Sequence, residues 1–256
     1  MGTFGGAQPI VTDGLVFAVD AANYESYTSG STTWSDMVGN GNNGTLVNGP
    51  TYDGANGGSI VFDGTNDYAT FGNILLDTLA GTGNKFTLCS WCNKNNSSTQ
   101  GPLIVKNADS TAGANERHMA FSFRSNRIDL VLIEKPNNTG WVKVIQNTSD
   151  LEYGIWYYMC ATYDGSISST NILDKVKLYI NGEEVSTFVL ASSGTLNNTL
   201  DGSNAPLSIG SAVSSVGNTG SGKFPGKIGY NSIYNRVLTA SEISQNYNAL
   251  KGRFGL

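Results

Sequence analysis

The sequence predicts an all-β protein, and three observations carry this prediction. Glycine contributes 32 of the 256 residues while charged residues make up only 14%, a composition typical of many short strands joined by turns under a neutral polar surface. Apolar and polar residues alternate strictly over 175–180, as they do on a half-buried strand. Asn181-Gly182 then separates this run from another over 183–189, which indicates a β-hairpin with a type I′ turn.

Length and charge narrow the classes of protein further. A chain of 256 residues is expected to form one sandwich domain and to bury roughly 70–75% of its unfolded surface, so it needs no disulfide or metal for its core. The net charge is −5, and we expect no nucleic-acid partner because no basic field would neutralise phosphates. No apolar run approaches the roughly 20 residues of a membrane helix. The first residues lack the charged and apolar regions of a signal peptide.

The first part of the chain predicts a mixture of strands and one long loop. Residues 1–13 are expected to form a flexible arm. Apolar residues over 15–20 indicate a strand buried on both faces. Residues 21–58 are expected to be a loop region, because their Gly and Asn residues favour left-handed backbone and tight turns, and a loop this long is often functional. The runs 59–63 and 68–71 are expected to pair across the turn between them.

The remainder of the chain predicts further strands and one helix. Strands are expected at 86–92, 103–106, 119–124, 127–133, 141–145, 156–163, 207–210 and 226–235. Residues 211–222 read as a Gly/Ser-rich loop. Thr239 and Glu242 have the spacing of a capping box, with Leu238 and Ile243 placed as the hydrophobic staple. The helix is expected to run to about Leu250, followed by a tail over 251–256.

Several phrases occur in the order of one known family. They are GLVFAVD at 14–20, FDGTNDY at 62–68, FTLCSW at 86–91, WYYMCATYDG at 156–165, KLYING at 177–182 and IYNRVLTASEI at 233–243. Together they resemble the LamG-like, concanavalin A-type jelly-roll domain over residues 14–250. The resemblance implies a two-sheet antiparallel jelly-roll sandwich with one short C-terminal helix. Gly229-Tyr230 stand where the family commonly carries an acidic residue, which puts a structural calcium of that kind in doubt.

The sequence predicts no enzymatic activity. Glycan-cleaving relatives on this fold use two carboxylates that flank the scissile bond, whereas Glu183 and Glu184 are adjacent and would point to opposite faces of a strand. His118 is the one histidine and is expected at a strand end. The chain has neither a G-x-S-x-G elbow nor a P-loop.

The three cysteines are interpreted as small buried apolar residues. Cys89 and Cys92 have the C-x-x-C spacing, but their surroundings indicate a strand, on which they would point to opposite faces. A redox pair would instead open a helix, and a zinc site would lack ligands. Cys160 is the third cysteine. Free thiols indicate synthesis in a reducing compartment.

Calcium and glycans are the ligands that the sequence favours, although no cofactor is required. Calcium prefers carboxylate, amide and carbonyl oxygens, and each candidate is otherwise a turn residue that bonds its own backbone. The candidate calcium ligands are Asp20, Asp63, Asn66, Asp67 and Asp164. A glycan would stack on exposed aromatic rings in or near loops, while strand residues Trp91 and Trp156 are expected in the core. The candidate glycan-binding residues are Trp34, Tyr52, Trp141 and Tyr153.

The fold alone does not settle function, because it hosts lectins, enzymes and structural modules. Domains of this type occur in secreted adhesins and in bacteriophage virion proteins, and the free thiols and neutral surface are more similar to the phage group. We therefore expect a non-enzymatic virion structural protein, made in the host cytoplasm: a capsid decoration, fibre or surface component present as repeated copies or a homo-oligomer. Residues 1–13 or 251–256 would contact neighbouring virion subunits. The alternative is a carbohydrate-binding adhesion module for a host-surface glycan.

Overall fold

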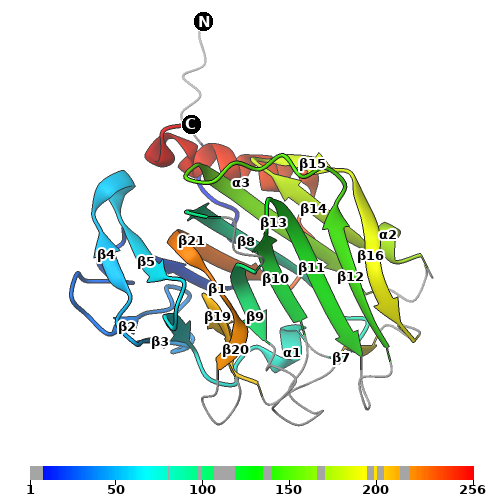
Figure 1. Ribbon diagram of the computed structural model, residues 1–256, viewed down its shortest axis with the longest axis horizontal. Coiled ribbons are helices and arrows are strands. Elements are labelled where there is room, and N and C mark those ends of the chain that lie inside the picture. The colour runs from blue at the N-terminus through cyan, green and yellow to red at the C-terminus, as the bar shows by residue number, and fades with distance from the viewer. Residues whose placement is uncertain are drawn as a thin grey trace, which may run out of the picture.

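Two large antiparallel sheets form the body of the molecule (Figure 1). The computed structural model describes residues 8–79, 81–96, 100–106, 119–134, 140–165, 171–194, 199–200, 205–213 and 219–256. The sheets contain 8 and 11 strands, and a separate pair makes a 2-stranded sheet. This arrangement confirms the predicted jelly-roll sandwich with one C-terminal helix.

The eight-stranded sheet joins the two ends of the domain. Its order is β15 (Glu183–Val185), β14 (Val176–Ile180), β13 (Trp156–Asp164), β8 (Lys85–Lys94), β21 (Pro225–Tyr234), β5 (Ser59–Asp63) and β4 (Thr51–Asp53), and β1 (Leu15–Asp20) also pairs with β21. Leu15 lies opposite Tyr234 and Asp20 opposite Tyr230. The first strand and the last one therefore close the domain together.

The eleven-stranded sheet contains most of the middle of the chain. Its order is β16 (Thr187–Ser193), β12 (Gly140–Gln146), β11 (Arg127–Glu134), β10 (Met119–Arg124), β9 (Pro102–Lys106), β18 (Ser208–Ile209), β6 (Tyr68–Thr70), β3 (Gly44–Val47) and β2 (Thr33–Trp34), with β17 (Thr199–Leu200) and β7 (Gly81–Thr82) paired beside β11. The two-stranded sheet pairs β19 (Ser211–Val213) with β20 (Thr219–Lys223).

Few helices complete the described fold. They are α1 (Leu76–Leu79), α2 (Ile172–Lys175), α3 (Ala240–Leu250) and the 3-10 turns η1 (Ala55–Gly57) and η2 (Lys251–Phe254). The predicted capping box of α3 is confirmed, because Thr239 N donates to Glu242 Oε2 at 2.8 Å and Glu242 N donates to Thr239 Oγ1 at 3.3 Å. Within the described residues, every helix is too short or too polar to cross a membrane.

The main core lies between the two large sheets. Alternate residues of β10 (Met119, Phe121 and Phe123) point into it, and Leu88 of β8 faces them from the other sheet. These side chains are fully buried, and removing their apolar surface from water is the dominant force that holds the sandwich together.

A second apolar cluster covers the opposite face of the eight-stranded sheet. It places Trp91, Tyr158 and Tyr234 of the sheet beneath Ile243 of α3 and Phe254 of η2. Strand β8 is therefore buried on both faces, and nine of its ten residues are buried. Cys89 belongs to this second cluster and Cys92 to the main core, which confirms that they point to opposite faces. Trp91 and Trp156 are buried as predicted.

The predicted Asn-Gly hairpin is confirmed, but its second arm divides. Asn181 and Gly182 have φ values of 52° and 88°, the positive values that a type I′ turn requires at both positions. Strand β15 pairs with β14, whereas β16 crosses to the other sheet and pairs with β12. The run 183–189 therefore contributes one strand to each of the two large sheets.

Other local predictions were wrong. Strands β5 and β6 do not pair, because they lie in different sheets, and the turn between them carries the chain from one layer to the other. The region 21–58 contains the strands β2, β3 and β4, and the described part of 211–222 contributes β19 and β20. Short strands of this kind have too few residues for alternation to be visible.

The described parts of the predicted arm and tail are packed on the domain. Val11 N donates to Asn246 Oδ1 at 2.7 Å, and Gln245 Nε2 donates to Pro9 O at 2.7 Å. Phe254 is 4% exposed within the second cluster. The expectation of a flexible arm is therefore corrected for residues 8–13, because hydrogen bonds attach them to α3. Residues 1–7 lie outside the described residues.

Candidate functional site

The outward-facing side chains of β10, β11 and β12 form a polar surface on the eleven-stranded sheet. Phe121 and Leu130 point into the core, so the residues next to them on each strand point away from it. We call these outward residues the outer face; they are Ala120, Ser122, Arg124, Arg127, Asp129, Val131, Ile133, Trp141, Lys143 and Ile145. Figure 1 shows the three strands side by side.

Strand register brings the charged residues of the outer face together. Arg124 lies opposite Arg127 across the β10–β11 hairpin, and Asp129 lies opposite Ser122. Lys143 of β12 lies opposite Val131, one outward position along β11 from Asp129. The two regular antiparallel ladders thus position these charges on rigid strands.

Asp129 is the buried centre of this group. Its side chain is 0% exposed, and Arg124 Nε donates to its Oδ2 at 2.6 Å. Burial raises the pKa of the Asp129 carboxyl, while the charges of Arg124 and Lys143 act in the opposite direction. Its second oxygen, Oδ1, accepts no hydrogen bond within the described part of the chain. Because the whole carboxylate is enclosed by the protein, its role here is to orient Arg124, whose side chain is partly exposed.

Positive charge predominates around the one buried carboxylate. Arg124, Arg127 and Lys143 are all partly exposed, whereas the whole chain has a net charge of −5. Burial, and then the charge of Arg124, lower the pKa of Lys143. Three cations against one acid make the outer face locally attractive to an anion on an otherwise acidic protein.

Trp141 supplies an aromatic surface on the same face. It lies opposite Ile133, two residues before Lys143 on β12, and its side chain is half-buried. A half-buried indole leaves part of its ring open to a ligand while the rest is fixed by packing. Trp141 is therefore a predicted glycan-binding residue that lies on the same face as Arg124, Arg127 and Lys143.

The other predicted glycan-binding residues do not join Trp141. Trp34 is 0% exposed in the main core, with its ring 6.5 Å from that of Phe71. The prediction that it stacks on a sugar is wrong, because no part of the indole reaches the surface; the apolar side chain is more stable in the core than in the loop region where it was expected.

Tyr52 and Tyr153 are half-buried at separate places. Tyr52 belongs to β4 of the eight-stranded sheet, and its ring packs 5.4 Å from that of Tyr27. Tyr153 stacks on Phe123 at 6.4 Å, with the Lys94 ammonium 5.7 Å from its ring. Both rings already have protein partners, so the four predicted aromatic residues do not make one site.

The predicted calcium ligands are not gathered into one site either. Asp20 of β1 lies opposite Tyr230 of β21, whereas Asp63 of β5 lies opposite Pro225, at the other end of β21. Asp164 lies opposite Lys85 of β8. Among the residues that the structure describes, no three His, Cys, Asp or Glu side chains are grouped to hold a metal ion. Calcium binding stays a prediction.

Each predicted calcium ligand for which a contact is described already has a hydrogen-bond or ion-pair partner in the protein. Asp20 Oδ1 accepts from Arg253 Nη1 at 2.7 Å, and Asp164 Oδ1 pairs with Lys85 Nζ at 3.0 Å. Asp63 Oδ1 accepts from the backbone N–H groups of Thr65 at 2.7 Å and Asn66 at 3.2 Å.

The turn after β5 is held mainly by its own residues. Asp67 Oδ2 accepts from Asp63 N at 3.0 Å, and Asn66 O accepts from Asn48 Nδ2 at 2.8 Å. These contacts match the interpretation of the acids as turn residues that bond nearby backbone. His118 lies outside the described residues.

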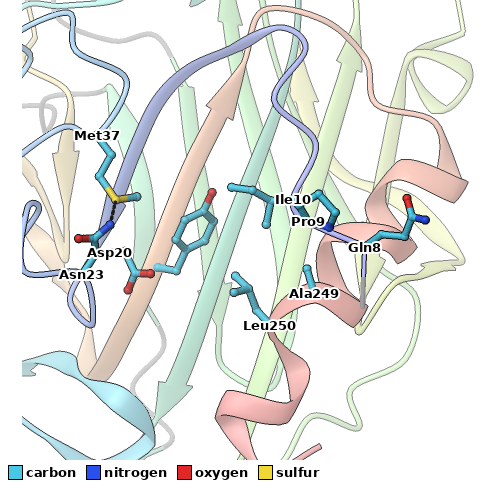
Figure 2. A pocket seen from close by; sticks show the side chains of 9 residues that line it. Gln8, Pro9, Ile10, Asp20, Asn23, Met37, Ala249 and Leu250 are labelled. Carbon is cyan, nitrogen blue, oxygen red and sulfur yellow. Dashed lines mark hydrogen bonds between the residues drawn. The ribbon is translucent and has the colours of Figure 1, made fainter. Parts of the chain in front are cut away.

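A cavity lies between the N-terminal segment and the end of α3. Figure 2 shows Pro9, Ala249 and Leu250 on one side and Met37 and Asn23 on the other. Its volume is about 350 Å³. Its polar groups are largely engaged, since Asn23 Nδ2 donates to Met37 Sδ at 3.2 Å and Asp20 pairs with Arg253. The outer face has more partly exposed charged side chains than the lining of this cavity.

Comparison with known proteins agrees with the architecture. The sequence profile of the concanavalin A-like lectin/glucanases superfamily matches residues 63–244. The chain belongs to this superfamily. The match covers most of the domain, including every strand of the outer face. A comparison with curated protein sequences finds no match.

Solved structures with the same fold include both binding domains and enzymes. The binding domain of Paraclostridial Mosquitocidal Protein 1 is 17% identical with a TM-score of 0.63, covering 92% of this chain and 52% of that one. Trypanosoma rangeli sialidase with sialic acid is 15% identical with a TM-score of 0.59, covering 95% and 34%. This lectin/glucanase-superfamily chain therefore spans about half the length of the first and a third of the second.

One similar structure has nearly the same length as this chain. Domain 4 of an extracellular arabinanase from Geobacillus stearothermophilus, solved with arabinotriose, is 20% identical with a TM-score of 0.58, covering 91% of this chain and 98% of that one. Identities this low establish the shared fold and not a shared activity.

Sequence reasoning missed Arg124, Arg127, Asp129 and Lys143. Each is a single charged residue at an outward position of an alternating strand, where a solvated polar residue is ordinary. The signal that could have found them is the hairpin of 119–124 and 127–133: pairing these runs across Ser125-Asn126 puts Asp129 beside Ser122. That inference needs the register, which alternation alone does not supply.

Proposed function

We propose that the chain is a non-catalytic carbohydrate-binding module whose site is the outer face of β10–β12. The observation that carries the proposal is the half-buried Trp141 on one face with three partly exposed cations, Arg124, Arg127 and Lys143, of which Arg124 is oriented by the buried Asp129 carboxylate. The similar arabinanase domain was solved with arabinotriose, and the mosquitocidal structure is a binding domain, which supports a binding role for this fold.

The outer face has two kinds of group that sugar recognition uses, hydrogen-bond donors and an aromatic ring. Arg124, Arg127 and Lys143 donate to ring, hydroxyl or carboxylate oxygens, and Trp141 packs on the apolar face of a sugar ring. Asp129, which Arg124 contacts, and the position opposite Trp141 are separated by the length of β11 from 129 to 133, roughly 13 Å at the rise of an extended strand. An oligosaccharide, longer than one ring, would touch both Arg124 and Trp141.

The charge of the outer face favours an acidic glycan. Arg124, Arg127 and Lys143 exceed the single carboxylate of Asp129, and a carboxylate or sulfate group on the sugar would offset that excess. A neutral oligosaccharide would lose this contribution. We therefore expect uronic-acid-containing, sialylated or sulfated glycans to bind more tightly than neutral ones of equal length.

The arrangement of acids supports binding without cleavage. Glycoside hydrolysis uses two carboxylates roughly 5–9.5 Å apart. Among the side chains of β10, β11 and β12 that the structure describes, Asp129 is the one acid. Its ion pair with Arg124 also suits a fixed hydrogen-bond acceptor better than an acid that gives and takes protons.

A glycan array tests the proposal. Fluorescently labelled protein should bind acidic oligosaccharides, and Trp141→Ala and Arg127→Gln should each weaken that binding at least tenfold. Tyr24→Ala is the matched aromatic control, because Tyr24 is 81% exposed away from the outer face. Folded wild-type protein that binds no glycan, or binding that Trp141→Ala and Arg127→Gln leave unchanged, would contradict the proposal.

We also propose that the module acts on a virion, as a decoration, fibre or surface component in repeated copies. The support is compositional: a neutral surface rich in Asn, Gly and Ser, with charged residues at 14%, suits a particle surface exposed to solvent. Mass spectrometry of purified particles should recover this chain as a stoichiometric component, and its recovery only from soluble secreted material would contradict the virion setting.

A further inference from the structure

Cys89 and Cys160 face each other in the middle of the eight-stranded sheet. Cys89 of β8 lies directly opposite Cys160 of β13 in the antiparallel register. Their sulfur atoms are 2.8 Å apart, and both side chains are fully buried in the second apolar cluster. We propose that these two residues form a disulfide that joins β8 to β13 when the chain folds in contact with a disulfide oxidant.

The sheet already has the geometry that the bond needs. Opposed residues of antiparallel strands have Cα atoms about 4.5–5.5 Å apart, which lies within the range of roughly 4.4–6.8 Å found for disulfides. The thiols are free in the structure, and joining them requires no change of register. The sulfur–sulfur distance of 2.8 Å shows that both side chains already point toward each other.

The third cysteine is excluded from the pair by its position. Cys92 points into the main core, where its Sγ lies 3.8 Å from Met159 Sδ. Cys89 and Cys92 are therefore on opposite faces of β8, and a bond between Cys92 and either of the other two would have to pass through the sheet. The pairing is thus fixed by the fold, although the sequence alone leaves three possible pairs.

The chemistry is thiol–disulfide exchange with a small disulfide such as oxidised glutathione. The thiolate of one cysteine attacks the small disulfide, forms a mixed disulfide and releases one reduced thiol. The thiolate of the second cysteine then displaces the other small thiol and forms the Cys89–Cys160 bond. Two cysteines are oxidised and one small disulfide is reduced, and the two cysteine protons end on the two released thiols.

Burial determines when this exchange can occur. Burial raises the pKa of the Cys160 thiol, so little thiolate forms in the folded protein, and no oxidant reaches a fully buried sulfur. Both strands are central in the sheet, so exposing the pair requires extensive unfolding. The bond therefore forms during folding, and once formed it resists reduction until the domain unfolds.

Refolding under defined redox conditions tests the proposal. Denatured wild-type protein is refolded with a mixture of oxidised and reduced glutathione, free thiols are alkylated in denaturant, and the peptides are mapped by mass spectrometry. We expect one alkylated cysteine, Cys92, and one cross-linked peptide pair that has lost two hydrogen atoms. Three alkylated cysteines, or a cross-link that includes Cys92, would overturn the proposal.

A melting experiment provides an independent readout. The oxidised wild-type protein should melt at a higher temperature than the same protein refolded with reductant, because the cross-link restricts the unfolded chain. Cys92→Ser should keep this difference, whereas Cys160→Ser should abolish it. A difference that persists in Cys160→Ser would contradict the assigned pair, and if that variant does not fold, the peptide map of the wild-type protein decides.

Discussion

The rings of Trp91 and Phe254 stack with their centroids 4.2 Å apart and 15° between their planes. Phe254 is the third residue from the end of this chain, and Trp91 lies on the central strand β8. The C-terminal 3-10 turn η2 thus completes the second apolar cluster, and the nearby pair of Arg253 with Asp20 at 2.7 Å fixes its position. The tail is part of the folded core.

Phe254→Ala should lower the free energy of unfolding by about 3–5 kcal/mol, as expected for removing a buried phenylalanine ring. Urea denaturation followed by tryptophan fluorescence measures this change, since Trp91 itself reports on the contact. Leu256→Ala is the control, because Leu256 is 45% exposed and its loss should change stability by less than about 0.5 kcal/mol. Equal midpoints for the two variants would show that the tail does not stabilise the domain.

Glu242 should make the stability of the domain sensitive to acid. Hydrogen bonds from Arg236 lower the pKa of Glu242 from 4.5 to about 2, with Arg236 Nη2 at 2.6 Å from Oε1. Because the folded pKa is lowered, the stabilisation is complete above pH 4.5 and is lost as the pH falls from 4.5 toward 2.

The variant Glu242→Gln should therefore melt below the wild-type protein at pH 7, and the difference should shrink as the pH approaches 2. Differential scanning calorimetry across this range measures it, with the exposed Glu183→Gln as control. A difference in melting temperature that stays constant from pH 7 to pH 2.5 would show that the ion pair with Arg236 does not act as described.

Lys106 should make the stability of the domain depend on pH in the alkaline range. Its Nζ is buried and donates to Asn73 Oδ1 at 2.6 Å and to Ala205 O at 2.7 Å, and burial lowers its pKa from 10.5 to about 8. Between pH 8 and 10.5 the unfolded state binds more protons at this site, so its contribution to the unfolding free energy rises with pH.

The comparison with Lys106→Met isolates this contribution. As the pH rises from 8 to 10.5, wild-type protein should gain about 1–3 kcal/mol relative to the variant, while cysteine and tyrosine ionisation affects both proteins alike. Urea titrations at several pH values measure the two curves. Parallel curves would mean that the Lys106 ammonium is not destabilised by its burial.

The ion pair on the outer face should be costly to break from one side. Arg124→Ala leaves the Asp129 charge buried without its partner, so we expect a loss of about 3–5 kcal/mol at pH 7. The pKa of Asp129, already raised by burial, should rise further in this variant.

A raised folded pKa means that the folded state binds the proton more readily, so the Arg124→Ala variant should recover stability relative to wild-type protein as the pH falls from 7 to 5. Denaturant titrations at both pH values, with the half-buried Arg127→Ala as control, measure this recovery. An equal loss at both pH values would argue that Asp129 is not ionised at this position.

Features set by neighbouring residues were predictable from the sequence. The Asn181-Gly182 turn and the Thr239–Glu242 capping box each depend on a few adjacent residues, and both appear where expected. The alternation over β10 also identified which of its residues face the core. Such features follow from local backbone preferences and from the period of the strand.

Features set by distant partners were not predictable. Whether β5 pairs with β6 depends on which sheet each strand joins, and whether Phe254 is buried depends on Trp91, 163 positions earlier in the sequence. Asp129 looks like a surface acid until the register places it under Arg124 and beside Lys143. Registry and layer assignment are properties of the whole sandwich, so no local pattern specifies them.

The most direct test of the proposed binding face is an amide chemical-shift titration of isotope-labelled protein with an acidic oligosaccharide that the array selects. We predict that the shifts concentrate on 120–124, 127–133 and 141–145, and that Trp141→Ala removes them while the remaining spectrum stays folded. Saturable shifts that concentrate instead on the helix-covered face of the eight-stranded sheet, around Ile10 and Leu250, would contradict the assignment.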